Sequence, residues 1–180
     1  MFSHIRSLIF LLVLFVAITA IPATAKTPPV PRTQAAEIRH QILMSPYYGV
    51  FDWIEAEVRP GRRVVLHGQV REPYAKSDAE SRIRKVEGVA VVVNEIEVLP
   101  VSQIDDNIRV AMYRAIFRYN GPLFRYANSV NPSIHIIVNN GRVTLKGIVG
   151  DRMDRQLAFI AARNVPGVFE VRNELTIDRA

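Results

Sequence analysis

Aromatic and arginine side chains are interleaved in one stretch of this 180-residue sequence, residues 105–126. Tyr113 and Phe117 lie four residues apart, with an arginine next to each ring. Aromatic rings of this kind settle at the boundary between water and hydrocarbon, and guanidinium groups pair with phosphates. The chemistry predicted here is reversible attachment to a phosphate-bearing surface, such as an anionic phospholipid membrane. The candidate residues are Arg109, Tyr113, Arg114, Phe117, Arg118, Phe124, Arg125 and Tyr126.

The same stretch has a second interpretation, which the sequence leaves open. Tyr113 and Phe117 can instead pack against the first half of the chain or against a second chain, and the arginines can form a solvated helix face paired with Asp105 and Asp106. An apolar patch indicates an interface without saying which one. The oligomeric state is equally open.

Residues suited to catalysis are scattered. His40, His67 and His135 fall in different predicted elements, and none has a second histidine or a carboxylate at a metal-chelating spacing. Asp151 and Asp154 begin a predicted helix, where carboxylates stabilise the N-terminus. No serine lies in a nucleophile elbow. We therefore expect a binding protein and not an enzyme, with no catalytic residues, no cofactor and no metal site.

The first 25 residues are typical of a secretory signal peptide. Arg6 precedes the apolar run 8–21, and the small residues of Ala23-Thr24-Ala25 follow it. The rival interpretation is a membrane anchor, but a run of 14 residues falls short of the ~20 that a spanning helix needs. We expect cleavage after Ala25 and a periplasmic location.

Charge and cysteine content narrow the class of partner. Cleavage would leave 22 basic and 17 acidic residues, a net charge of +5, which favours anionic lipid headgroups or envelope polymers. Export makes nucleic acid a poor candidate. The sequence contains no cysteine, which excludes disulfides, thiolate metal sites and a lipoprotein anchor.

An internal repeat organises the rest of the chain. Residues 63–98 and 142–177 align without a gap at an offset of 79, and 13 of 36 positions are identical. Self-similarity of this kind indicates repeated structural units. The opening segments 37–39 and 107–109 also resemble each other, at an offset of 70.

The residue pattern of each copy predicts the same order of helices and strands, αββαβ. Helices are predicted at 34–45 and 75–86, and again at 105–120 and 151–164, where the core stripe of 105–120 includes Met112 and Tyr119. Hairpins are predicted across Pro60-Gly61 and Asn139-Asn140-Gly141, with closing strands at 89–98 and 168–177. The fold class is α+β, in which each copy has a three-stranded mixed sheet with two helices on one face. The predicted organisation is a signal peptide at 1–25, a linker at 26–33 and domains at 34–100 and 101–180.

This pattern resembles the BON domain family. The similarity lies in V-x-L-x-G-x-V at 64–70 and 143–149, V-x-G-V at 86–89 and 165–168, and V-x-N-E at 92–95 and 171–174. Two such copies after a signal peptide resemble the dual-BON periplasmic and outer-membrane proteins of Gram-negative bacteria. The sequence departs from the lipoproteins of that group, which are anchored through an N-terminal cysteine.

The resemblance implies a non-enzymatic protein that binds phospholipid membranes and supports envelope integrity or the osmotic stress response. An alternative is a protein-interaction or scaffolding module of an envelope or secretion complex. A third is binding to peptidoglycan or polysaccharide.

Overall fold

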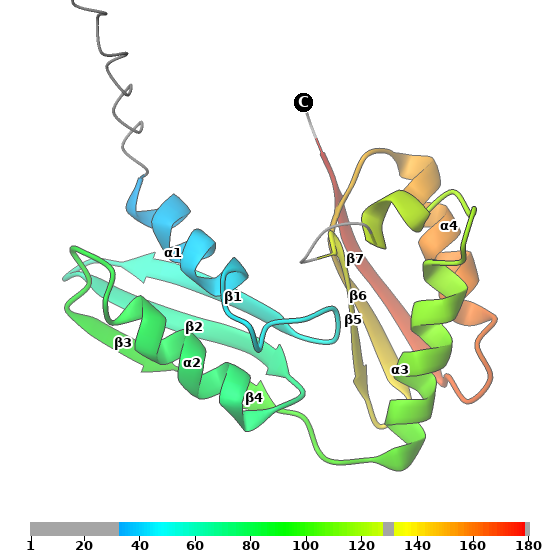
Figure 1. The fold of residues 1–180 in the computed structure, drawn as a ribbon, viewed down its shortest axis with the longest axis horizontal. Helices are drawn as coiled ribbons and strands as arrows, with labels where there is room; N and C mark the ends of the chain where they lie inside the picture. Colours follow the sequence, from blue (N-terminus) through cyan, green and yellow to red (C-terminus); the bar gives the residue numbers. More distant parts are fainter. Residues whose placement is uncertain (1–32, 128–131, 179–180) are drawn as a thin grey trace, which may run out of the picture. The chain divides into compact units, whose positions relative to one another are not determined.

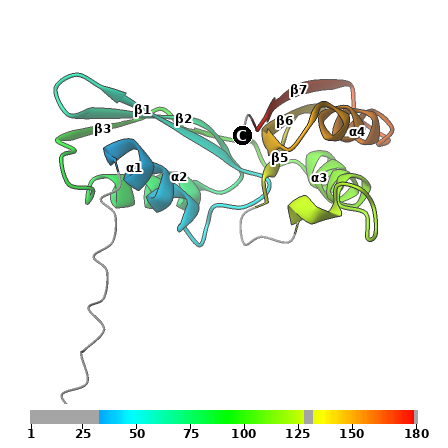
Figure 2. The ribbon, with the colours of Figure 1, turned by 90° about the horizontal axis from the view of Figure 1, so that it is seen from above.

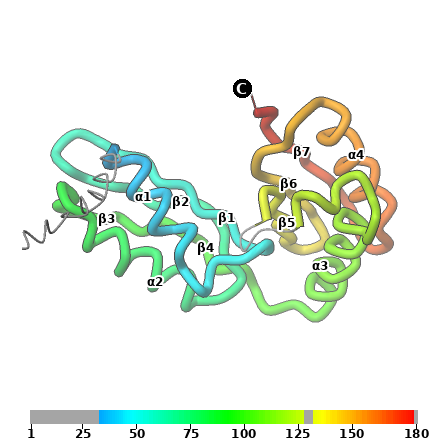
Figure 3. Tube along the Cα trace, turned by 45° about the horizontal axis from the view of Figure 1, so that its top comes forward, coloured from blue at the N-terminus to red at the C-terminus, as the bar shows by residue number. Residues whose placement is uncertain are grey.

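The computed structural model describes residues 33–127 and 132–178. Within them the chain forms two α+β modules in tandem, each with its own mixed sheet (Figure 1). The Cα trace completes the first module before it enters the second (Figure 3). The predicted fold class is confirmed. The predicted signal peptide and all but the last residue of the predicted linker lie outside the described residues.

The first module has two helices and a sheet of four strands. β1 pairs antiparallel with β2, and β3 and β4 both pair parallel with β2. Both helices cover one face of this sheet (Figure 2). The elements are α1 (Gln34–Leu43), β1 (Trp53–Arg59), β2 (Arg63–Val70), α2 (Pro73–Ile83), β3 (Val91–Asn94) and β4 (Glu97–Val98).

The second module repeats this plan with a three-stranded sheet. β5 pairs antiparallel with β6, and β6 pairs parallel with β7 along its whole length. The elements are α3 (Gln103–Ile116), the short 3-10 helix η1 (Phe124–Ala127), β5 (Ile134–Asn139), β6 (Arg142–Val149), α4 (Arg152–Arg163) and β7 (Glu170–Ile177).

Local sequence signals explain where the helices begin. The side chains of Thr33, Ser102 and Asp151 accept hydrogen bonds from the free N–H groups in the first turns of α1, α3 and α4. Each module buries its own apolar core between helices and sheet. No helix among the described residues combines the length and apolar character that crossing a bilayer requires.

The structure corrects two predicted elements. The last strand of the first module is interrupted between Asn94 and Glu97, so that its sheet has four strands and not the predicted three. The helix predicted at 105–120 ends at Ile116, because Phe117 leaves the helical conformation and Asn120 adopts a positive φ. Tyr119, predicted in the core, is consequently on the surface, 75% exposed.

One glycine in each module fixes the register of its hairpin. Gly68 and Gly147 have φ values of 121° and 119°, a region that L side chains rarely adopt. A Cβ at Gly68 would overlap the carbonyl oxygen of Trp53, and one at Gly147 would overlap that of Ser133. The main chains of the paired strands therefore approach closely at both positions, where no side chain fits.

We expect Gly68→Ala to destabilise the protein by on the order of 3 kcal/mol, because it adds a main-chain clash to an unfavourable φ. Gly61→Ala is the matched control, since Gly61 also has a positive φ but open space around its Cα; it should cost only about 1 kcal/mol. Urea unfolding measures both variants. Equal losses would contradict the clash.

Candidate functional site

Two arginines at the C-terminal end of α3 are exposed. Arg114 lies in the last turn of the helix, and Arg118 follows the helix end. Neither side chain forms an ion pair or hydrogen bond within the part of the chain that the structure describes. Tyr113, next to Arg114, is 39% exposed. These three residues lie on the surface.

Phe117 does not lie on the surface. Its side chain is 5% exposed and belongs to the apolar core of the second module, with Met112 and Ile116 of α3. The helix ends just before Phe117, and this change of backbone direction lets the ring turn inward. The prediction that the Phe117 ring projects toward solvent was wrong.

Arg109 is also buried, with an exposure of 2%. Its Nη1 donates to Asp106 Oδ1 at 2.7 Å, and its Nη2 donates to the carbonyl oxygen of Val138 at 2.7 Å. A buried guanidinium is tolerated only when it is paired and hydrogen-bonded in this way. Arg109 therefore joins α3 to β5 and does not face a partner.

Arg125 and Tyr126 form a small polar cluster with Asp154 of α4. Arg125 and the Tyr126 hydroxyl both donate to the buried Asp154 carboxylate, and the Tyr126 hydroxyl accepts from the Gly150 N–H at 2.7 Å. This cluster attaches η1 to the start of α4. The Arg125 side chain remains 57% exposed, but its charge is already paired.

Tyr119 adds an exposed ring that the sequence did not predict at the surface. It contacts the half-buried ring of Phe124, with 5.3 Å between the ring centroids. The exposed part of the predicted site is therefore smaller than expected. It lacks the ring of Phe117 and gains the ring of Tyr119. We call it the α3-end surface: Tyr113, Arg114, Arg118, Tyr119 and Phe124.

Tyr113 has neighbours from both modules. Its ring centroid lies 5.0 Å from that of Phe117 and 6.4 Å from that of Phe51, which precedes β1. Phe51 and Val50 also pack against the core of the second module. Part of the Tyr113 ring is therefore covered by the first half of the chain, as one of the two alternatives for this residue predicted.

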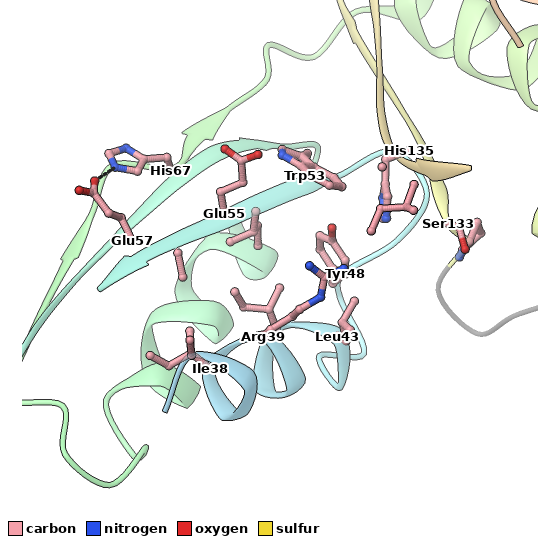
Figure 4. Close-up of a pocket in the computed structure, with 17 residues that line it drawn as sticks. Ile38, Arg39, Leu43, Tyr48, Trp53, Glu55, Glu57, His67, Ser133 and His135 are labelled. Carbon is pink, nitrogen blue, oxygen red and sulfur yellow. Dashed lines mark ion pairs between the residues drawn. The ribbon is translucent and has the colours of Figure 1, made fainter. Parts of the chain in front are cut away.

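A groove beside α1 and β1 is a concave feature that sequence reasoning missed (Figure 4). Its volume is about 770 Å³, and residues of α1, β1 and the start of β5 line it. We call it the α1–β1 groove. At its inner end the His135 ring lies between Tyr48 and Trp53, with centroid distances of 5.1 Å to each.

His135 joins the segment before β1 to the start of β5. It is 4% exposed, and its Nδ1 lies 3.1 Å from the Gly49 carbonyl oxygen, in hydrogen-bonding range. Burial lowers the pKa of His135 to about 4, against a smaller upward effect of this hydrogen bond. The ring is therefore neutral at pH 7.

Nearby Asp52 organises the same segment. Its carboxylate accepts from the N–H groups of Gly49 and Arg71, at 2.9 and 2.7 Å. Burial raises the pKa of Asp52, and the two hydrogen bonds oppose that effect. One signal could have indicated this site: Tyr-Tyr-Gly-Val-Phe-Asp-Trp at 47–53 holds four aromatic residues, more than a connection between a helix and a strand requires.

The described residues hold no group of three or more histidine, aspartate or glutamate side chains that could bind a metal ion.

The BON domain model matches residues 32–100 and again residues 124–179, which together make up more than half of the chain. The chain belongs to the BON domain family. It carries two BON domains in tandem, and such domains are generally non-catalytic.

The similarity of this BON protein to other known proteins is weak. No curated protein matches the chain. It is similar to two structures of CdsD, a structural protein of the type III secretion system of Chlamydia trachomatis, at 12% identity and with TM-scores of 0.31 and 0.29. Each alignment covers 79% of this chain, and 92% and 96% of the respective CdsD chains. Likenesses this weak do not bear on function.

The buried histidine predicts a pH dependence of stability. Its pKa is lower in the folded than in the unfolded protein, so the unfolded chain binds more protons between pH 6.5 and about pH 4. The free energy of unfolding should be highest above pH 6.5 and fall as the pH decreases through this window. The contribution of His135 is on the order of 3 kcal/mol.

Urea unfolding at several pH values measures this effect. His135→Asn should have a flatter profile than the wild type between pH 6.5 and 4, and the comparison removes the contribution of carboxylates that titrate in the same range. His67→Asn is the control, because His67 is only partly buried and pairs with Glu57 and Glu95 on the surface. Parallel profiles for His135→Asn and wild type would contradict the assignment.

Proposed function

We propose that this BON protein is a non-catalytic binding protein that associates peripherally with anionic phospholipid membranes through the α3-end surface. The observation that carries the proposal is the pair of exposed arginines, Arg114 and Arg118, without an acidic partner among the described residues. Tyr119 supplies an exposed aromatic ring next to Arg118. The resemblance to dual-BON envelope proteins supports the same assignment.

The expected attachment is reversible. A basic side chain near an anionic surface contributes about 1 kcal/mol, so Arg114 and Arg118 together supply about 2 kcal/mol. Tyr119 and Phe124 add amphipathic rings suited to the headgroup region. Arg109 and Phe117 are excluded from this surface by burial, and Arg125 contributes less because it already pairs with Asp154.

The proposed location is the periplasm, where the protein supports envelope integrity or the response to osmotic stress. This part of the proposal rests on residues 1–25, which have the basic start, apolar run and small-residue site of a cleavable signal peptide.

A second candidate function is scaffolding by protein–protein contact. The α1–β1 groove favours it, since a concave surface next to several aromatic side chains is typical of a site for another molecule. This candidate uses different residues from the membrane proposal, so each can be tested by itself.

A flotation assay with phosphatidylglycerol and phosphatidylcholine vesicles tests the membrane proposal. We expect binding to the anionic vesicles, and Arg114→Ser with Arg118→Ser should weaken it about thirtyfold at low salt. The charge-matched control is Arg152→Ser with Arg163→Ser, two exposed arginines on α4, which should keep most of the binding. Equal losses in both double variants, or no flotation with either lipid, would refute the α3-end surface as the membrane site.

A further inference from the structure

The outer edges of β1 and β5 are equivalent positions of the repeat. In the described sheets β1 pairs only with β2, and β5 pairs only with β6, so each strand has one edge outside its own pairing. The register identifies the counterparts. Ala56 lies opposite Leu66, and Ile136 lies opposite Leu145; the two leucines are identical positions of the repeat. Ala56 is therefore the counterpart of Ile136, and Val58 that of Val138.

The edge of β5 is occupied from within the chain. The N–H of Ile136 donates to the carbonyl oxygen of Val50 at 2.8 Å, and the carbonyl oxygen of Val138 accepts from Arg109 at 2.7 Å. Outward-facing main-chain groups recur at every second residue of an antiparallel edge strand. The main-chain groups of Ile136 and Val138 therefore point out of the sheet, and each residue has a hydrogen-bond partner outside the sheet.

The equivalent groups of β1 have no such partners. Ala56 and Val58 make no main-chain hydrogen bond beyond the pairing with β2 in the described residues. Arg39, which corresponds to Arg109 in the repeat, is exposed and does not bond to this strand. Among residues 33–127 and 132–178, the same edge is therefore filled in one module and open in the other.

The open edge borders the α1–β1 groove. The α1 side of this groove is mostly apolar, with Ile38, Ile42 and Leu43, and also holds Arg39; β1 lines the other side. An extended segment added to β1 would turn every second side chain toward this apolar wall. Trp53, at the inner end, has a buried indole N–H without a hydrogen-bond partner in the described structure.

The other face of β1 is acidic. Glu55 and Glu57 are exposed and project away from α1 (Figure 4). Glu57 pairs with Arg59 in its own strand, whereas Glu55 has no partner among the described residues. A second copy paired antiparallel about Ala56 would place Glu55 of one chain opposite Glu57 of the other, which is destabilising. Basic side chains at these places would be stabilising.

We propose that the edge of β1 binds an extended segment of a partner polypeptide in which apolar residues alternate with basic ones. The main-chain groups of Ala56 and Val58 provide the hydrogen bonds, as in other complexes formed by strand addition. The apolar residues of the segment face the α1 side of the groove, where the half-buried Leu43 lies, and its basic residues face Glu55. The site uses no residue of the α3-end surface, so it stands independently of membrane binding.

The test uses the full chain and two synthetic hexapeptides with blocked ends, one alternating lysine and valine and one alternating glutamate and valine. NMR titration measures affinity, and amide hydrogen exchange measures protection. The lysine peptide should bind at least tenfold more tightly at low salt and should protect the Ala56 and Val58 amides. No protection of these amides at millimolar peptide, or equal affinity for both peptides, would overturn the proposal.

Two variants sharpen the result. Glu55→Lys with Glu57→Lys should reverse the preference between the peptides, whereas Glu87→Lys with Asp178→Lys, which changes two exposed acidic residues elsewhere, should leave it unchanged. Ala56→Pro should abolish binding of both peptides, because it removes the outward N–H without breaking a hydrogen bond to β2. A preference that follows net charge in both double variants would refute recognition at this edge.

Discussion

The register of each hairpin is the constraint on which the rest of the structure depends. At Gly68 and Gly147 the main chain of the paired strand approaches so closely that no side chain fits. A shift of the pairing by one residue would exchange the two faces of the strand. The register puts Ile54 into the core and leaves Glu55 on the acidic face. It also decides which main-chain groups point out of the sheet, and so where a further segment can pair.

The repeated glycines and hairpins could be predicted from the sequence because they are local: a close approach or a tight turn imposes its residue types directly. The end of α3 shows where such reasoning fails. A helical period continued to residue 120 puts Tyr119 in the core and Phe117 outside, but the helix ends at Ile116 and the two rings exchange roles. The Asn120-Gly121-Pro122 sequence was the available stop signal. Position on a helical wheel has no meaning beyond the last helical residue.

The α1–β1 groove and the His135 site could not be predicted, for a different reason. Their members come from α1, β1 and β5, and what brings them together is tertiary packing. His135 looks unremarkable in sequence, since its repeat counterpart Glu55 is an exposed carboxylate. Packing against Tyr48 and Trp53 buries the ring, and this burial makes it neutral. The aromatic composition of 47–53 indicated an interface without indicating its partner.

Duplication gives the two copies different surfaces on one backbone plan. In the second copy Arg109 turns inward and bonds to β5, while the corresponding Arg39 of the first copy stays exposed. Asp106 explains part of this difference, because it pairs with Arg109 one turn away, whereas the residue one turn before Arg39 is Ala36. An arginine without a nearby carboxylate loses more by leaving water. The difference between Asp106 and Ala36 thus accompanies a strand edge that is filled in the second copy and open in the first, among the described residues. In this way a repeated domain acquires a second kind of contact without a change of fold.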